Sequence, residues 1–87
     1  MADGYNLQTS KLARKVMAKI PLPWSERIAR TIGMLLTDPY LGEKMSGKLS
    51  GCRKIRVWPY RIIYRLDKKA KIIIVLEVKH RGNVSYD

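Results

Sequence analysis

Residues 52–67, with the sequence CRKIRVWPYRIIYRLD, alternate basic and aliphatic side chains on both sides of a Pro-Tyr step. A period of two is typical of β-strands that bury one face and expose the other. We therefore predict a β-hairpin whose turn is formed by Pro59 and Tyr60. The cross-strand pairs that follow are Trp58 with Arg61, Arg56 with Ile63, and Lys54 with Arg65.

This pairing separates charged from apolar side chains, because directly opposed residues lie on the same face of a sheet. One face is mostly basic and carries Lys54, Arg56, Trp58, Arg61, Ile63 and Arg65. The other face is apolar and carries Ile55, Val57, Ile62, Tyr64 and Leu66. We expect the apolar face to pack on the core of the protein.

The basic face has two interpretations. Alternating cations are often only the solvent side of a half-exposed sheet. Like charges directly opposite each other destabilise a sheet, however, and uncharged polar side chains would solvate the same face without repulsion. Several cations on one patch favour a surface that binds phosphate, because the planar fork of arginine grips two phosphate oxygens at once.

The segments before the hairpin have the apolar spacing of helices. A short strand is expected at residues 5–8, after which Thr9 or Ser10 can cap a helix over residues 11–20. A Pro-Leu-Pro segment ends this helix. A second apolar stripe over residues 24–36 predicts a second helix. We expect both helices to share one face of the sheet.

A third strand is expected after the hairpin. Residues 38–51 are rich in turn residues and are assigned to a loop. A three-residue turn at 68–70 leads into the aliphatic run at 71–79 and pairs Asp67 with Lys71. This register directs four aliphatic side chains to the core, namely Ile72, Ile74, Leu76 and Val78.

The same register extends the basic face onto the third strand. It places Glu77 opposite Arg61 and adds Lys79 and Arg81 to the cations of the hairpin. A turn one residue shorter would bring His80 to this face in place of Arg81. With the longer turn, His80 points away from the basic face, where a structural role and a catalytic role are both open.

Length and charge narrow the class of protein. At 87 residues we expect a single domain, residues 1–87, and 46% hydrophobic with 29% charged residues is a globular composition. The formal charge of +11 favours a polyanionic partner such as nucleic acid, although a basic composition is equally compatible with a merely solvated surface.

The sequence favours the cytoplasm over a secreted or membrane location. The single cysteine, Cys52, cannot form an internal disulfide, and no histidine or cysteine cluster suggests a metal or another cofactor. The first residues lack the basic start and apolar run of a signal peptide, and residues 72–76 are too short an apolar segment to span a bilayer. We expect a cytoplasmic protein without a membrane partner.

The features of the chain follow one another in a recognisable order. Two helical stripes precede DPYLGEKMSGKLSG, which is followed by CRKIRVW, PYRIIYRLD, a long aliphatic strand and HRGNVSY. This series resembles the RelE/ParE superfamily of bacterial and archaeal toxins over nearly the whole chain, most strongly over residues 38–81. The resemblance implies an α+β fold in which two N-terminal helices pack on one face of a small twisted antiparallel sheet.

The resemblance also implies a toxin of a type II toxin-antitoxin system, with two alternative activities. RelE-like members enter the ribosomal A site and cleave mRNA, without a metal, to leave a 2′,3′-cyclic phosphate. ParE-like members bind DNA gyrase and need no nuclease residues. We expect the first activity, with ribosome and mRNA as partners and a RelB-like antitoxin whose acidic segment covers the basic face. A basic RNA-binding domain without catalysis is a third interpretation.

Four basic residues match the catalytic pattern of RelE-like members, and Tyr86 is the candidate for its terminal tyrosine. By resemblance, Lys54 would transfer a proton or stabilise charge, Arg56 and Arg61 would hold the scissile phosphate, and Arg81 would support the transition state or the leaving group. Tyr86 would stack on a base or orient the hydroxyl. Its spacing from Arg81 differs by one residue from some family patterns, so an ordinary tail residue is the alternative.

Arginine at position 56 stands where some relatives have lysine, and a guanidinium is a poor proton donor at neutral pH. The possible acid or base is then His80, because histidine ordinarily changes charge near neutral pH. The RNA-binding candidates are Arg53, Trp58, Arg65 and Lys79. Trp58 either stacks on a base at the hairpin tip or shields the turn, whereas Trp24 and Tyr64 are expected in the core.

Overall fold

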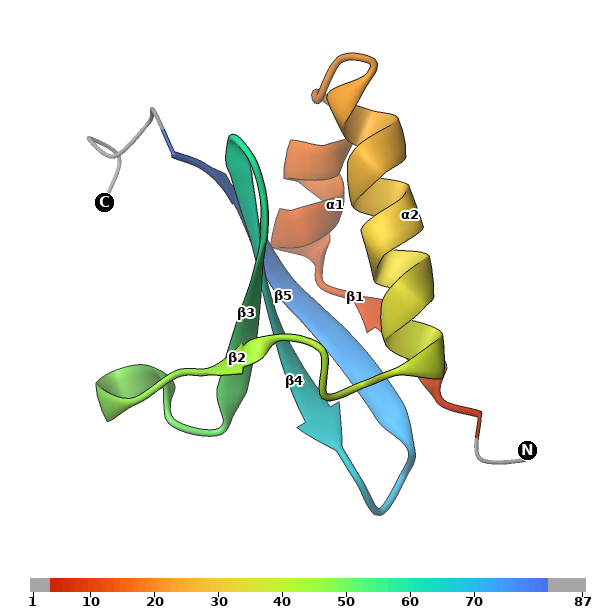
Figure 1. Ribbon diagram of the computed structural model, residues 1–87, viewed down its shortest axis with the longest axis vertical. Coiled ribbons are helices and arrows are strands. Elements are labelled where there is room, and N and C mark those ends of the chain that lie inside the picture. The colour runs from red at the N-terminus through yellow and green to blue at the C-terminus, as the bar shows by residue number, and fades with distance from the viewer. Residues whose placement is uncertain (1–3, 82–87) are drawn as a thin grey trace.

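Both helices of the computed structural model lie on one side of a sheet (Figure 1). The structure describes residues 4–81, and within them the sheet has five strands in the order β1-β5-β4-β3-β2. The elements are β1 (Asn6–Thr9), α1 (Lys11–Met17), α2 (Trp24–Thr37), β2 (Glu43–Lys44), the 3-10 turn η1 (Gly47–Leu49), β3 (Cys52–Val57), β4 (Tyr60–Asp67) and β5 (Ile72–His80). The predicted α+β class is confirmed.

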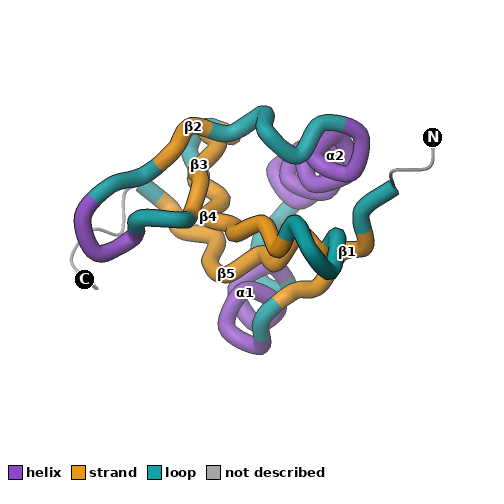
Figure 2. The backbone as a smooth tube through the Cα atoms, turned by 90° about the horizontal axis from the view of Figure 1, so that it is seen from below, coloured by secondary structure: helices purple, strands orange, loops and turns teal. Residues whose placement is uncertain are grey.

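The sheet is mixed, although its central part is the antiparallel meander that the sequence predicts. β3 pairs with β4 and β4 with β5 in antiparallel fashion, whereas β1 pairs with β5 in parallel. The two helices lead the chain from β1 to β2 at the opposite edge of the sheet (Figure 2). The chain returns to β1 only with β5, which runs parallel to it. The strand expected at residues 5–8 is therefore present as β1, but its parallel pairing differs from the antiparallel sheet that the resemblance implies.

The core lies between the helices and the inner face of β4 and β5. Its main cluster comprises Ala13, Ile20, Ile28, Ile32, Ile62, Val75 and Val78. Trp24 packs against this cluster and Tyr64 is fully buried, as predicted for both. Helix α1 ends at Met17, before the predicted end at Ile20, because the Pro-Leu-Pro segment follows, yet Ile20 still reaches the core.

The hairpin has a different register from the predicted one. Its two-residue turn is formed by Trp58 and Pro59, and Tyr60 is the first residue of β4, paired with Val57. Tyr60 packs on the core cluster, which explains why it joins the strand instead of the turn. The observed pairs on the basic face are Arg56 with Arg61, Lys54 with Ile63, and Cys52 with Arg65. The predicted pairs were wrong by two residues, a shift that leaves every side chain on its predicted face.

The turn from β4 to β5 occupies four residues, 68–71, because Lys71 adopts a left-handed conformation (φ 57°) and Asp67 pairs with Ile72. This reverses the predicted facing of the first half of β5. Ile73 and Val75 are buried, and the predictions of Ile72, Ile74 and Leu76 as core residues were wrong.

A β-bulge at Leu76 then reverses the alternation again. Tyr64 pairs with Val75 and Ile63 pairs with Glu77, so Leu76 has no partner of its own on β4. Beyond the bulge Val78 faces the core, as predicted. Ser10 holds this bulge: its Oγ donates to the Leu76 carbonyl (2.7 Å) and accepts from the Ala13 backbone N–H (3.0 Å), which also caps α1.

The connection from α2 to β3 is more ordered than the predicted loop. It contains β2, which pairs with Arg53 and Lys54 of β3. The buried Tyr64 hydroxyl donates to the Pro39 carbonyl (2.9 Å) and accepts from the Gly42 backbone N–H (2.8 Å). Gly42 has no room for a side chain, because a Cβ there would lie 2.7 Å from the Lys54 carbonyl oxygen. Burial raises the pKa of the Tyr64 hydroxyl above its ordinary value.

Candidate nucleic-acid interface

A row of cations crosses the outer face of the sheet, on the side away from the helices. Arg56 of β3 lies directly opposite Arg61 of β4, which lies directly opposite Lys79 of β5. Neighbouring strands are about 4.8 Å apart. Lys79 joins this row because the bulge at Leu76 reverses the alternation of β5. Without the bulge, Lys79 would point toward the helices.

Arg81 extends the row beyond the end of β5. Its guanidinium lies over the Trp58 ring, 4.8 Å from the ring centroid, and its backbone N–H donates to the Pro59 carbonyl (2.8 Å). The side chain and the backbone of Arg81 are therefore both held against the hairpin turn. This arrangement arises because the end of β5 lies beside the turn between β3 and β4.

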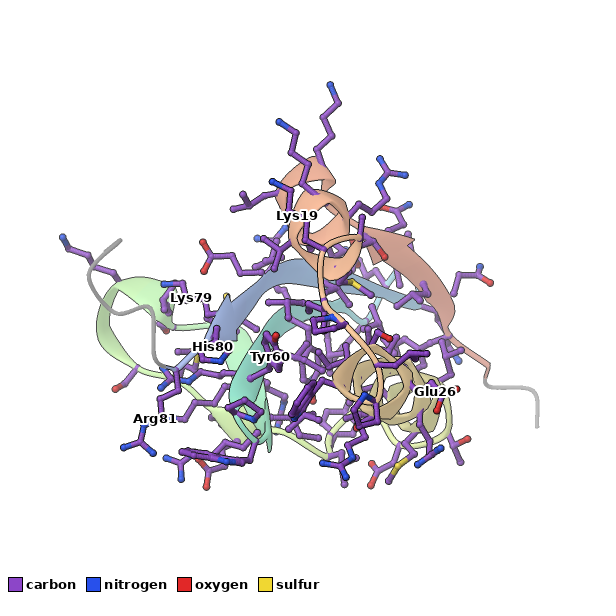
Figure 3. All side chains as sticks on the ribbon, turned by 90° about the horizontal axis from the view of Figure 1, so that it is seen from above. Lys19, Glu26, Tyr60, Lys79, His80 and Arg81 are labelled. Carbon is purple, nitrogen blue, oxygen red and sulfur yellow. The ribbon has the colours of Figure 1, made fainter. Side chains whose placement is uncertain are left out.

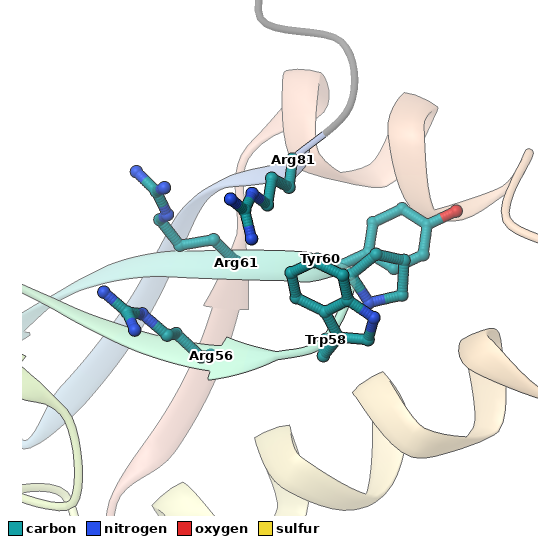
Figure 4. Close-up of a pocket in the computed structure, with 6 residues that line it drawn as sticks. Arg56, Trp58, Tyr60, Arg61 and Arg81 are labelled. Atoms are coloured by element: carbon teal, nitrogen blue, oxygen red, sulfur yellow. The ribbon is translucent and has the colours of Figure 1, made fainter.

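These residues surround an open hollow of about 300 Å³ (Figure 4). Its lining consists of Arg56, Trp58, Pro59, Tyr60, Arg61 and Arg81. We call this hollow the arginine groove. The three guanidinium groups come from β3, β4 and the end of β5, and the Trp58 ring comes from the hairpin turn, whereas the Tyr60 ring is turned toward the core and His80. The groove thus combines donors for a phosphate with one flat surface for a base, the Trp58 indole.

The charges of the arginine groove lack acidic partners among the described residues. In residues 4–81, the part that the structure describes, no carboxylate forms an ion pair with Arg56, Arg61 or Arg81. Lys79, by contrast, has its Nζ 3.4 Å from a carboxylate oxygen of Glu77. Like charges that face each other across a sheet repel, so an anion in the groove would relieve this repulsion.

The other predicted site residues lie at different distances from the groove. Lys54 lies on the same face as Arg56, two positions earlier on β3, and Arg65 lies on that face opposite Cys52. Neither lines the groove. The predicted catalytic pair Arg56 and Arg61, together with Arg81, is what the fold brings together.

Arg53 belongs to the opposite face. It pairs with Tyr64, its guanidinium donates to the Gly42 carbonyl (2.8 Å), and it lies 5.0 Å from the centroid of the Tyr40 ring. These contacts tie the connection before β3 to the sheet. The structure does not bring Arg53 to the arginine groove.

His80 also points away from the basic face, as predicted, although its register differs from the predicted one. It is paired with Tyr60, and the two rings meet edge to face with centroids 4.9 Å apart. Figure 3 shows Tyr60 and His80 close together, with Arg81 on the far side from the helices. Tyr86, the fifth predicted catalytic residue, lies outside the described residues.

Sequence reasoning missed Tyr60 and Pro59 as lining residues, because it assigned both to a turn. The signal that identifies Tyr60 is its aromatic ring two positions before the buried Ile62, a spacing that continues the strand. Among residues 4–81, no group of three or more histidine, cysteine or acidic side chains is placed to hold a metal ion, and no helix there is long and apolar enough to cross a membrane.

Comparison with known proteins assigns the family. The family model described as the ParE toxin of type II toxin-antitoxin system, parDE, matches residues 7–84. The chain belongs to the ParE toxin family. This ParE-family protein is therefore a toxin of a type II toxin-antitoxin system, within the RelE/ParE superfamily.

Relatives of this ParE-family toxin include proteins with RelE names. It is 26% identical to Toxin RelG of Mycobacterium tuberculosis over 82 residues, which cover 92% of this chain and 94% of that one. Its structure matches a chain of the toxin-antitoxin complex RelBE2 of the same organism with a TM-score of 0.81 and 26% identity, covering 90% and 99% of the two chains.

The isolated E. coli RelE toxin has the same fold. It matches with a TM-score of 0.78 and 23% identity, over 87% of this chain and 83% of that one. A chain of the archaeal RelE-RelB complex of Pyrococcus horikoshii matches with a TM-score of 0.75 and 24% identity, over 93% and 99%. Two of these three solved structures are toxin-antitoxin complexes. The ParE-family toxin thus has the fold of toxins that pair with antitoxins.

Proposed function

We propose that this toxin is a ribosome-dependent endoribonuclease that cleaves mRNA in the A site and so inhibits translation. One observation carries the proposal: Arg56, Arg61 and Arg81 surround one hollow without a carboxylate partner in the described part of the chain. The fork of a guanidinium matches two phosphate oxygens, and three such groups can hold a phosphodiester through a change in its charge.

The chemistry follows from the residues of the basic face. The 2′-oxygen of the ribose forms a bond to phosphorus, the bond from phosphorus to the 5′-oxygen breaks, and a 2′,3′-cyclic phosphate and a 5′-hydroxyl result. One proton leaves the 2′-hydroxyl and one reaches the 5′-oxygen. Arg56 and Arg61 would hold the phosphate while charge develops on it, and Arg81 would stabilise the leaving oxygen.

Proton transfer falls to a group outside the lining of the groove, because guanidinium groups are poor proton donors. Lys54 and Lys79 are amines on the same face as Arg56 and Arg61, and Lys79 forms an ion pair with Glu77. His80 lies on the other face, against Tyr60, so Lys54 has the more favourable position. Ribosomal groups around a bound mRNA can also exchange the protons, which is consistent with activity on the ribosome.

The net charge of the toxin supports the proposal that it binds the ribosome and mRNA. A net charge of +11 on 87 residues steers the protein toward polyanions such as the ribosome and its mRNA. A RelB-like antitoxin with an acidic segment would neutralise the arginine groove and block it. These partners place the toxin in the cytoplasm, where ribosomes are found.

The second candidate is a toxin that inhibits DNA gyrase without cleaving nucleic acid. The matched family model is that of ParE, and the described residues that line the groove include three arginines but no amine or imidazole. Both observations suit binding without proton transfer. In this case the basic face would contact an acidic protein surface or DNA instead of mRNA.

The test is to add purified toxin to ribosomes programmed with one mRNA, to the same mRNA free in solution, and to gyrase acting on relaxed plasmid. Reverse-transcription stops in the A site on ribosomes alone support the endoribonuclease. Loss of supercoiling without such stops supports the gyrase inhibitor and contradicts the first proposal.

A further inference from the structure

Trp58 is the large aromatic residue at the rim of the arginine groove, and it is unusually exposed. The fraction of its surface open to solvent is 65%, although the core clusters offer apolar partners a few residues away. The turn that holds Trp58 is also the turn to which the Arg81 backbone is bonded. An exposed indole on a fixed turn is a flat surface whose orientation is set before any ligand arrives.

Arg81 determines which part of the indole is accessible. Its guanidinium covers one side of the ring at 4.8 Å, and the exposure of the residue leaves the rest open. The same guanidinium lines the groove beside Arg56 and Arg61. A base that stacks on Trp58 would therefore lie next to the positions that hold phosphate, and the two parts of one nucleotide would be bound together.

We propose that Trp58 is the base-stacking residue of the arginine groove, which binds one nucleotide of single-stranded RNA with its base on the indole and its phosphodiester between Arg56, Arg61 and Arg81. This inference deepens the proposed function and rests on RNA as the ligand, but not on cleavage. A duplex would hide its bases, so the groove selects single strands.

The experiment measures binding of short RNA to the full chain in solution, without ribosomes. The probes are a fluorescently labelled oligoadenylate, the same length of abasic ribose phosphate, and a duplex of the same sequence. The variants are Trp58→Ala, Trp58→Phe and the matched control Tyr40→Ala. Tyr40 is another exposed aromatic residue with an arginine over its ring, at 5.0 Å, and it lies outside the groove.

The wild type is expected to bind oligoadenylate more tightly than the abasic strand or the duplex. Trp58→Ala is expected to weaken oligoadenylate binding roughly 5- to 150-fold, the range that corresponds to the loss of one base–aromatic stack, and to leave abasic binding unchanged. Trp58→Phe should retain most of the preference for bases, and Tyr40→Ala all of it. Melting curves of the variants confirm that each is folded.

Two results would overturn the inference. An equal loss of affinity for both strands in Trp58→Ala would show that Trp58 acts only by positioning Arg81. A wild-type protein that binds the two strands equally, or binds neither, would show that no base stacks in the groove. A preference for bases that persists in a toxin unable to cleave ribosomal mRNA would overturn the proposed catalysis and leave the stacking intact.

Discussion

Arg56 and Arg61 face each other directly across the β3–β4 hairpin, and neither has a carboxylate partner in the described part of the chain. The sheet does not require arginine at either position, and two opposed guanidinium groups destabilise the sheet when the groove is empty. A bound phosphate or an acidic antitoxin segment would convert this repulsion into attraction. The pair is therefore better explained by a ligand than by the stability of the free toxin.

The first prediction concerns toxicity. The double variant Arg61→Ala/Arg81→Ala removes two of the three guanidinium groups of the groove, so ribosomal cleavage should fall on the order of 100-fold or more and growth arrest should be relieved. Growth after induced expression measures the effect. Circular dichroism checks that the variant is folded, and a loss of fold would instead make these residues structural.

The control for this variant is Arg27→Ala/Arg30→Ala. Both arginines are exposed on α2, on the helical side of the protein, so the pair removes the same charge away from the groove. We expect this control to stay toxic. Equal relief of toxicity in both double variants would mean that only total charge matters.

The second prediction concerns the repulsion itself. Arg56→Gln should raise the free energy of unfolding at low ionic strength by a few tenths of a kcal/mol, and this difference from the wild type should shrink as salt rises from about 0.01 M to about 1 M. Urea titrations at both salt concentrations measure it. Arg30→Gln has the same loss of charge without an opposed arginine, and a similar gain there would remove the cross-strand explanation.

The third prediction concerns Ser10, which caps α1 and bonds to the bulge residue Leu76. Ser10→Ala should lower the free energy of unfolding by about 1–2 kcal/mol, because one helix donor and one carbonyl lose their partner. Chemical denaturation checks the value. Ser25→Ala, near the start of α2, where no side-chain capping bond is made, should have a much smaller effect.

The fourth prediction concerns pH. Burial raises the pKa of Tyr64, so the folded protein keeps this proton at a pH where the unfolded chain loses it. The stabilisation is complete below the ordinary pKa of 10.0 and is lost as pH rises through the folded pKa. Tyr64→Phe should lack this alkaline loss. Its free energy of unfolding should also be lower near neutral pH by about 1–3 kcal/mol, because the Gly42 N–H and the Pro39 carbonyl lose their partner.

Urea titrations of wild type and Tyr64→Phe between neutral pH and pH values above 10 measure this difference. All other titratable groups are the same in both proteins, so their contribution to the difference cancels. Parallel stability curves for the two proteins over the alkaline range would contradict the assignment.

Local patterns in the sequence were sufficient for the facing of the hairpin. Alternation assigns Arg56 and Arg61 to one face and Ile62 and Tyr64 to the other, and a register error of two residues cannot change that. The pairs themselves depend on whether Tyr60 belongs to the turn or to the strand. Packing of Tyr60 against the helices decides this, and it is not a local property.

The third strand was less predictable for the same reason. The left-handed Lys71 lengthens the turn, and the bulge at Leu76 depends on a bond from Ser10, which is 66 residues away in sequence. The longer turn and the bulge each reverse the alternation of β5, so their effects cancel beyond Leu76. Val78 was therefore predicted correctly and Ile74 was not. The contact between Trp58 and Arg81 likewise requires two strand ends to meet, so the sequence alone suggests both residues as site candidates but not that their side chains lie against each other.

The most direct test of the arginine groove as an RNA-cleaving site uses ribosomes programmed with a defined mRNA and mapped by reverse transcription. Wild type and Arg27→Ala/Arg30→Ala should both cut the codon in the A site and leave a 2′,3′-cyclic phosphate, whereas Arg61→Ala/Arg81→Ala should not. Cuts of equal strength by all three proteins, or none by the wild type while it still arrests growth, would contradict the account.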